Sequence, residues 1–150
     1  MHAGIDAEKR EGRTGQKGKQ VSEKLAVEFM IPYPPSGNHI WKHTQAGAHY
    51  LTPKAQLYYQ TVAVEVMRQS AHRALEGRLG VRCVIYPPDK RRRDMDNAWK
   101  VISDACTRAR VWIDDNQIDQ LTLFRARDSQ AKGVISMRVW VLEESVANQA

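Results

Sequence analysis

The segment Val81–Ala109, VRCVIYPPDKRRRDMDNAWKVISDACTRA, sets the fold because it joins a strand to a helix. Val81–Tyr86 is mostly apolar and is followed by Pro87-Pro88, which predicts a strand that ends there. A helix is predicted from about Asp96. Its apolar residues recur at helical spacing on one face: Ala98, Val101, Ile102, Ala105, Cys106 and Ala109. A strand that leads into an amphipathic helix is typical of a sheet with helices packed on it.

The segments around this unit predict further strands and a second helix. Leu25–Ile31 is typical of a strand, and Ile40–Leu51 is compatible with a short hairpin. Thr52-Pro53 predicts a helix start, and apolar residues at helical spacing extend it to about residue 74. Ile118–Arg127 and Val134–Leu142 both alternate, which predicts a hairpin. We therefore expect an α/β (α+β) domain in which two main helices pack on a small mixed sheet.

The chain divides into an N-terminal arm and one folded domain. Residues 1–24 contain glycines and charged residues but few large apolar ones, which predicts a disordered basic arm. Residues 25–145 are expected to form the single domain. No apolar run reaches the roughly 20 residues of a membrane span, and no apolar leader is present. The expected location is the cytoplasm.

Composition favours an acidic partner. The net charge is +6 and the isoelectric point is near 9.5, which fits nucleic acid, although a merely basic soluble protein has the same charge. Cys83 and Cys106 have no nearby zinc-ligand pattern and are expected to be buried thiols. Phosphate-loop, dinucleotide-binding, zinc-protease and serine-hydrolase motifs are all missing from the sequence, so we expect no small-molecule substrate.

Asp89–Asn97, DKRRRDMDN, combines four consecutive cations with two acids. If the segment is extended, Asp94 and Asp96 point to one side, and two carboxylates that close favour a hard divalent cation such as Mg²⁺ or Mn²⁺. The alternative is that Asp96 caps the following helix and Asp94 is a solvated loop residue. Beside such acids, the cations would attract a polyanion, and phosphodiester hydrolysis needs both elements.

Two further features of the helix region bear on this choice. Lys100 shares the polar helix face with Asp96 and Asp104, where it either forms an i,i+4 ion pair or stabilises charge on a phosphoryl group. Asp114-Asp115 follows the helix and has the composition of an ordinary turn. This second acidic pair matters to the site only if the fold brings it beside Asp94.

Three blocks of the sequence are similar to one known family. They are Pro34–Asn38, Arg91–Asn97 followed by Lys100, and Trp112–Asp115. In order and spacing the chain resembles the RusA-type Holliday junction resolvases, small nucleases of bacteria and their phages. The resemblance covers about residues 25–142. One departure is Arg110, which stands where the family often has glycine after the second helix.

The resemblance implies a homodimer that binds four-way DNA junctions and resolves them by paired Mg²⁺-dependent nicks in DNA recombination and repair. It implies metal binding by Asp94, Asp96 and Asp115, and an essential basic residue at Lys100. The DNA contacts that it implies are Lys90, Arg91, Arg92, Arg93 and Asn38. The alternatives are a non-catalytic junction-binding protein of prophage origin and an interaction protein that uses its Trp and Tyr residues.

Overall fold

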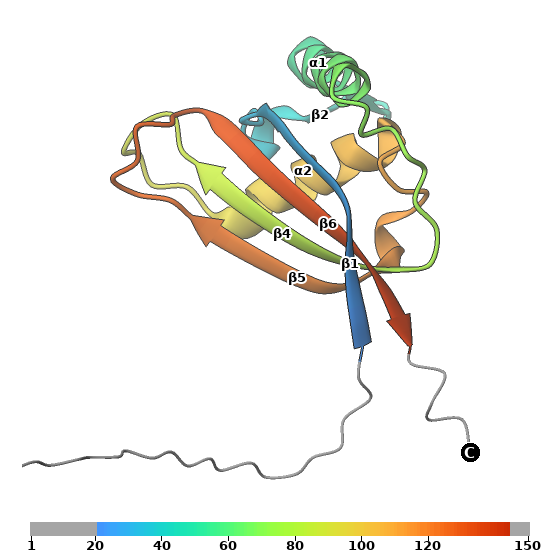
Figure 1. Cartoon of the computed structure of the whole chain (residues 1–150). Helices are drawn as coiled ribbons and strands as arrows, with labels where there is room; N and C mark the ends of the chain where they lie inside the picture. Colours follow the sequence, from blue (N-terminus) through green and yellow to red (C-terminus); the bar gives the residue numbers. More distant parts are fainter. Residues whose placement is uncertain (1–20, 145–150) are drawn as a thin grey trace, which may run out of the picture.

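The structure is a computed structural model that describes residues 21–144, so most of the predicted N-terminal arm lies outside it. The elements in chain order (Figure 1) are β1 (Val21–Pro32), the 3₁₀ turn η1 (Gly37–His39), β2 (Trp41–His43), β3 (His49–Leu51), α1 (Pro53–Arg68), β4 (Arg78–Tyr86), α2 (Met95–Arg108), the 3₁₀ turn η2 (Asp115–Gln117), β5 (Ile118–Arg125) and β6 (Val134–Glu144). This order confirms the predicted succession of strand, short hairpin, helix, strand, helix, strand and strand.

Four strands form one mixed sheet in the order β1-β6-β4-β5. β4 and β5 are parallel, whereas β6 runs antiparallel to both of its neighbours, β1 and β4. Figure 1 shows α2 crossing behind this sheet. The expected small mixed sheet with two packed helices is therefore confirmed. Between residues 21 and 144, neither helix combines the length and the apolar character that a membrane crossing needs.

The core lies between the sheet and the helices. Cross-strand neighbours on one sheet face are buried together, as in the rows Val81–Val139, Cys83–Met137 and Ile85–Ile135. The predicted apolar stripe of α2 is buried along its whole length, because it packs on this face. Both cysteines are free and buried, as expected. Burial raises the pKa of the Cys83 thiol to about 12, so it remains protonated at neutral pH.

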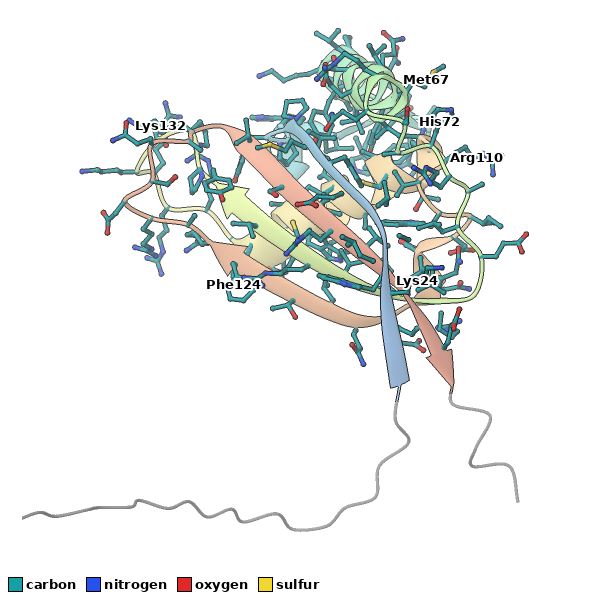
Figure 2. All side chains as sticks on the ribbon, in the orientation of Figure 1. Lys24, Met67, His72, Arg110, Phe124 and Lys132 are labelled. Carbon is teal, nitrogen blue, oxygen red and sulfur yellow. The ribbon has the colours of Figure 1, made fainter. Side chains whose placement is uncertain are left out.

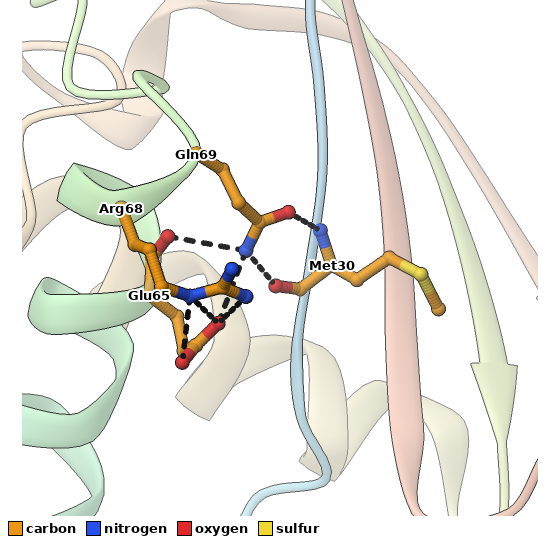
Figure 3. A network of polar contacts seen from close by, with 4 residues as sticks. All are labelled: Met30, Glu65, Arg68 and Gln69. Atoms are coloured by element: carbon orange, nitrogen blue, oxygen red, sulfur yellow. Dashed lines mark hydrogen bonds and ion pairs between the residues drawn. The ribbon is translucent and has the colours of Figure 1, made fainter.

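α1 begins as predicted but ends earlier than predicted. The Thr52 hydroxyl accepts a hydrogen bond from the Ala55 backbone N–H at 3.2 Å and so caps the helix. The expected extension to residue 74 is wrong, because the helix ends at Arg68. The Gln69 amide instead pairs with the Met30 backbone, accepting from its N–H at 2.8 Å and donating to its C=O at 2.7 Å (Figure 3). Gln69 thus satisfies groups at the free edge of β1 and attaches α1 to the sheet.

Two other expectations are corrected by the sheet. β1 begins at Val21, so residues 21–24 belong to the domain and not to the arm. The predicted β5–β6 hairpin is wrong, because β4 lies between these two strands. The segment 126–133 therefore crosses the end of β4 instead of closing a tight turn. It is attached there by hydrogen bonds from Ala126 N–H to Ile85 C=O at 2.8 Å and from Gly133 N–H to Tyr86 C=O at 2.8 Å.

Candidate metal and nucleic-acid site

The carboxyl ends of the parallel strands β4 and β5 meet at one edge of the sheet, which we call the carboxyl edge. β4 ends at Tyr86, β5 ends at Arg125, and α2 starts from this same edge at Met95. A cavity of about 600 Å³ lies here, between the segment Asp89–Met95 and the segment 125–132. Open α/β sheets place their ligands beyond the carboxyl ends of parallel strands, so this edge is where a site is expected.

Asp94 lines this cavity and is the N-cap residue of α2. Its carboxylate makes no capping hydrogen bond, and within residues 21–144 its one polar contact is with the Asn97 amide at 3.5 Å. An N-cap aspartate normally accepts from the first turn of its helix, so an exposed one that does not is available to a ligand. The alternative in which Asp96 caps the helix is wrong, because Asp96 lies inside the first turn.

Asp94 and Asp96 lie together at the N-terminal end of α2. The segment is extended only as far as Asp94, because the helix begins at Met95 and includes Asp96. Asp96 is exposed and lies outside the lining of the cavity. Both carboxylates lie at the N-terminal end of α2, where the helix dipole favours negative charge. The structure thus brings these two predicted residues to one end of one helix.

Lys100 is exposed on α2, one turn after Asp96 and one turn before Asp104. The alternative in which Lys100 forms an i,i+4 ion pair is wrong within residues 21–144, where no salt bridge includes it. Asp104 pairs instead with Arg108, whose Nε lies 3.1 Å from the Asp104 Oδ2. The Lys100 ammonium is therefore available to a ligand of opposite charge.

Asp115 lies at the other end of the parallel strand pair, which we call the amino edge. It directly precedes β5, whose first residue Ile118 is opposite Leu79 near the start of β4. The 14 residues of α2 span about 21 Å and separate the two edges. The fold therefore does not bring Asp115 beside Asp94 within one chain.

The environment of Asp115 is acidic. Burial raises its pKa, and so do a hydrogen bond with Asp114 and the charges of Asp114 and Asp104. Asp114 has a local structural role, because its Oδ1 accepts from the Asn116 backbone N–H at 3.0 Å in the cap of η2. This matches the expected turn. A cation at the amino edge would relieve the repulsion among these carboxylates.

Arg93 is held inside the fold. Its guanidinium donates to both carboxylate oxygens of Asp89 at 2.6 and 3.0 Å and lies 5.5 Å from the centre of the Tyr33 ring. Its backbone carbonyl accepts a hydrogen bond from the Arg125 guanidinium. The Arg93 guanidinium, with the Arg91 backbone N–H, holds the pKa of Asp89 below its usual range. The backbone just before Asp94 is therefore clamped from two sides.

The other predicted DNA contacts are open to solvent. Lys90, Arg91 and Arg92 are exposed, and of these only Arg91 is near an acid within residues 21–144, at 3.6 Å from Asp89. Asn38 lies in η1, which packs against α2, but its side chain is outside the described part of the chain. The cations of the Asp89–Met95 segment thus form one wall of the cavity.

Comparison with known proteins fits this arrangement. A profile of the family described as Endodeoxyribonuclease RusA matches residues 32–138. The chain belongs to the RusA family. The crossover junction endodeoxyribonuclease RusA of Escherichia coli (strain K12) is 34% identical over 90 residues, which are 60% of this chain and 74% of that protein. The protein of the same name from Enterobacteria phage HK97 is 32% identical over 98 residues, which are 65% of this chain and 81% of that protein.

Sequence reasoning missed the second wall of the cavity in this RusA-family chain. Arg125, Arg127 and Lys132 line the cavity from the side opposite the Asp89–Met95 segment. Their charges are plain in the sequence, but the predicted hairpin places them at a remote turn. The parallel pairing of β5 with β4 is what brings them to the carboxyl edge.

The described part of one RusA-family chain does not complete a metal site by itself. Between residues 21 and 144, no three His, Cys, Asp or Glu side chains are close enough together to hold a metal ion. The available donors are carboxylate oxygens, which suit hard cations such as Mg²⁺ and Mn²⁺. Mg²⁺ commonly binds through one or two carboxylates and completes its shell with waters and substrate phosphates. Asp94 and Asp96 fit that requirement.

Proposed function

We propose that this chain is a Mg²⁺-dependent endodeoxyribonuclease that resolves four-way (Holliday) DNA junctions by paired nicks, in recombination and repair. The observation that carries the proposal is the uncapped Asp94 carboxylate at the edge of a cation-lined cavity, in a chain of the RusA family. Its relatives include crossover junction endodeoxyribonucleases of bacteria and of phages. We place its action on DNA in the cytoplasm of a bacterial host.

Asp94 and Asp96 hold the divalent cation, with Asp115 as the third protein ligand. When bound, Mg²⁺ (or Mn²⁺ in its place) supplies a Lewis acid for the scissile phosphate and lowers the pKa of a water. The donor chemistry supports this assignment, because exposed carboxylates without structural hydrogen bonds are free to bind a hard cation.

Asp115 reaches the site from the second subunit of a homodimer. The support is geometric: Asp115 is a charge neighbour of Asp104, which follows Asp94 by ten residues or about 15 Å of helix, whereas ligand distances to Mg²⁺ are near 2 Å. A two-fold axis near the middle of the exposed face of α2 would reverse the helix direction and place the start of one α2 beside the end of the other. Lys100 lies midway between Asp96 and Asp104 on that face.

The cations divide into those that bind DNA and those that position the site. Lys90, Arg91 and Arg92 bind phosphates, because their side chains extend into solvent beside the cavity. Arg93 fixes the backbone before Asp94 through its bonds to Asp89 and contributes positive charge from a half-buried position. Lys100 stabilises the negative charge that develops on the phosphate during cleavage. Asn38 contacts DNA from η1.

The decisive experiment compares cleavage with binding. The Asp96→Asn variant should lose Mg²⁺-dependent nicking of a four-way junction while it keeps wild-type junction affinity, because it removes a ligand and no basic side chain. Linear duplex of the same sequence is the substrate control. Nicking by Asp96→Asn at the wild-type rate would rule out the assigned ligand. Tight junction binding without any Mg²⁺-dependent product from the wild type would support the alternative, a non-catalytic junction-binding protein.

A further inference from the structure

More cationic than acidic side chains line the cavity at the carboxyl edge. Seven of the side chains that line it are Lys or Arg and three are Asp, which leaves an excess of four positive charges. Asp89 is already paired with Arg93 and approached by Arg91. Like charges gathered around one cavity repel each other, so such a cluster favours an anion between its walls.

The segment 126–133 supplies two cations without structural partners. Arg127 and Lys132 are exposed, and within residues 21–144 neither side chain takes part in a salt bridge or hydrogen bond. Arg125 differs, because its guanidinium donates to the Arg93 carbonyl and is committed to that bond. Figure 2 shows Lys132 at the far end of the molecule from Arg110 and away from Lys24. The side chains of Arg127 and Lys132 are therefore available to bind an external ligand.

The position of these cations is fixed by the backbone. Gly133 donates to the Tyr86 carbonyl at 2.8 Å and accepts from the Tyr33 N–H at 3.0 Å, so the segment is attached to both β4 and β1. At its other end the Ala126 N–H is bonded to Ile85 at 2.8 Å. A segment attached at both ends presents its cations at a set separation from the opposite wall, which lowers the entropy lost on binding.

We propose that this cavity is a phosphate-binding subsite in which Arg127 and Lys132 hold the DNA backbone of one junction arm beside Asp94. The proposal rests on the proposed function and adds a second basic wall to it. Lys90, Arg91 and Arg92 bind the strand from one side, and Arg127 and Lys132 bind it from the other. The DNA strand is thereby held between the two walls of the cavity, next to the Asp94 carboxylate.

Salt dependence tests this subsite directly. The double variant Arg127→Ala/Lys132→Ala and the wild type are titrated with a fluorescent four-way junction at about 50, 100 and 200 mM KCl without divalent cation. Each lost phosphate contact lowers the slope of log K against log salt by about 0.9, so the double variant should lose about 1.8 for each subunit that binds the junction, or about 3.6 for the dimer. Its affinity deficit should therefore shrink about tenfold per bound subunit across this salt range.

A charge-matched control separates a subsite from general electrostatics. Lys24→Ala/Arg82→Met removes two exposed cations that lie outside the lining of the cavity, on β1 and β4. This control should keep the wild-type slope. Thermal melting of both double variants verifies that the proteins are folded.

The outcomes distinguish this proposal from the proposed function. If Arg127→Ala/Lys132→Ala binds with the same slope and affinity as the control, the subsite is wrong even when the wild type nicks junctions normally. If the wild type binds junctions with the expected slopes but yields no nick with Mg²⁺, the nuclease function is wrong and the subsite stands. A loss of slope by about two per bound subunit in the double variant alone supports the subsite.

Discussion

The two edges of the β4–β5 pair differ in charge and in the structural role of their side chains. At the carboxyl edge, cations surround the cavity and a clamp of Asp89, Arg93 and Arg125 fixes the backbone before Asp94. At the amino edge, Asp115 lies among other carboxylates, and its pKa is raised by burial and by those neighbours. The carboxyl edge has an excess of positive charge, whereas carboxylates gather around Asp115 at the amino edge.

This difference shows that neither edge is a complete site. A nuclease needs cations to bind the phosphate backbone and carboxylates to hold the metal, and here Asp115 lies beside Asp104, more than two turns of α2 away from Asp94 and the cations of the cavity. In the proposed dimer, a two-fold axis would present the amino edge of one subunit to the carboxyl edge of the other and so bring these groups together.

The largest expected effect is complementation between two inactive chains. Asp96→Asn and Asp115→Asn should each lower junction cleavage by about 10³-fold or more, since a lost metal ligand costs several kcal/mol of transition-state stabilisation. When the two variants are refolded together, a mixed dimer contains one site with all its acids and one site with neither Asp96 nor Asp115. Nicking of one strand should return, measured by denaturing gel electrophoresis of an end-labelled junction.

The opposite arrangement, in which Asp115 completes the site of its own chain, predicts a different cleavage result. If Asp115 serves its own chain, each subunit of the mixed dimer carries one defective site, and the mixture stays as inactive as either variant. Asp96→Asn refolded with Asp94→Asn is the matched control, because both changes lie at the carboxyl edge and no intact site forms in either arrangement. Activity in that control would indicate contamination by wild type.

A smaller effect is expected from the clamp at the carboxyl edge. Arg125→Met removes the hydrogen bond to the Arg93 carbonyl and frees the backbone next to Asp94. Because misplacement by about 1 Å costs up to roughly 10²-fold in rate, kcat should fall about ten- to a hundredfold, with junction affinity within about twofold of wild type. Single-turnover cleavage and equilibrium binding measure the two quantities separately.

Arg82→Met is the control for this clamp. Arg82 also extends from the sheet, but it lies over the Phe124 ring at 4.6 Å and makes no contact with the cavity. Its kcat should stay at the wild-type value. Should junction affinity fall in proportion to kcat in Arg125→Met, Arg125 would be a direct DNA contact and not a positioning residue.

Local patterns in the sequence predict most elements but not their neighbours in the sheet. The apolar stripe of α2 and the Thr52 cap are short-range features, and the structure confirms both. Strand pairing depends on distant segments, so alternation in β5 and β6 indicates a hairpin that the insertion of β4 rules out. The error hides Arg127 and Lys132, because a remote turn gives no reason to place them beside Asp94.

The acids illustrate the same limit at the site. Residue type and the family resemblance indicate Asp94, Asp96 and Asp115 from the amino-acid sequence alone. Periodicity cannot show that Asp94 and Asp96 begin a helix instead of sharing one side of a strand, because helix boundaries carry an error of a few residues. The distance to Asp115 is a property of the β4–α2–β5 connection, and no local pattern encodes it.

At the amino edge we expect a modest gain in stability from Asp115→Asn. The folded state raises the pKa of Asp115, so its ionised form opposes folding at neutral pH. The gain should be well under about 1 kcal/mol because the side chain is exposed, which corresponds to less than about 4 °C in Tm. The gain in stability should be complete at a pH above the raised pKa of Asp115. It should vanish as the pH falls below the ordinary pKa of an aspartate, about 4.

Asp119→Asn should do the opposite and serves as the matched control, because Asp119 lies in β5 directly after the turn that contains Asp115. Its ion pair with Arg78 lowers the pKa of Asp119, so the charge supports folding above about pH 4. That contribution is lost as the pH falls through the lowered pKa. Melting curves at about pH 7 and pH 3.5 in metal-free buffer compare the two variants. Equal changes in Tm of the same sign for both variants at neutral pH would contradict the carboxylate repulsion assigned to the amino edge.

The smallest prediction concerns the end of α2 at the amino edge. Arg110 adopts φ of 67°, a left-handed conformation that costs a non-glycine residue roughly 1 kcal/mol or slightly more. Arg110→Gly should therefore stabilise the protein by about 1 kcal/mol and raise Tm by about 2–4 °C. Ala109→Gly is the paired control, because Ala109 has helical φ of −80° and glycine there should destabilise. If both glycines lower Tm, the Arg110 side chain supplies contacts that outweigh its backbone strain, and the amino edge is held together by more than its turn geometry.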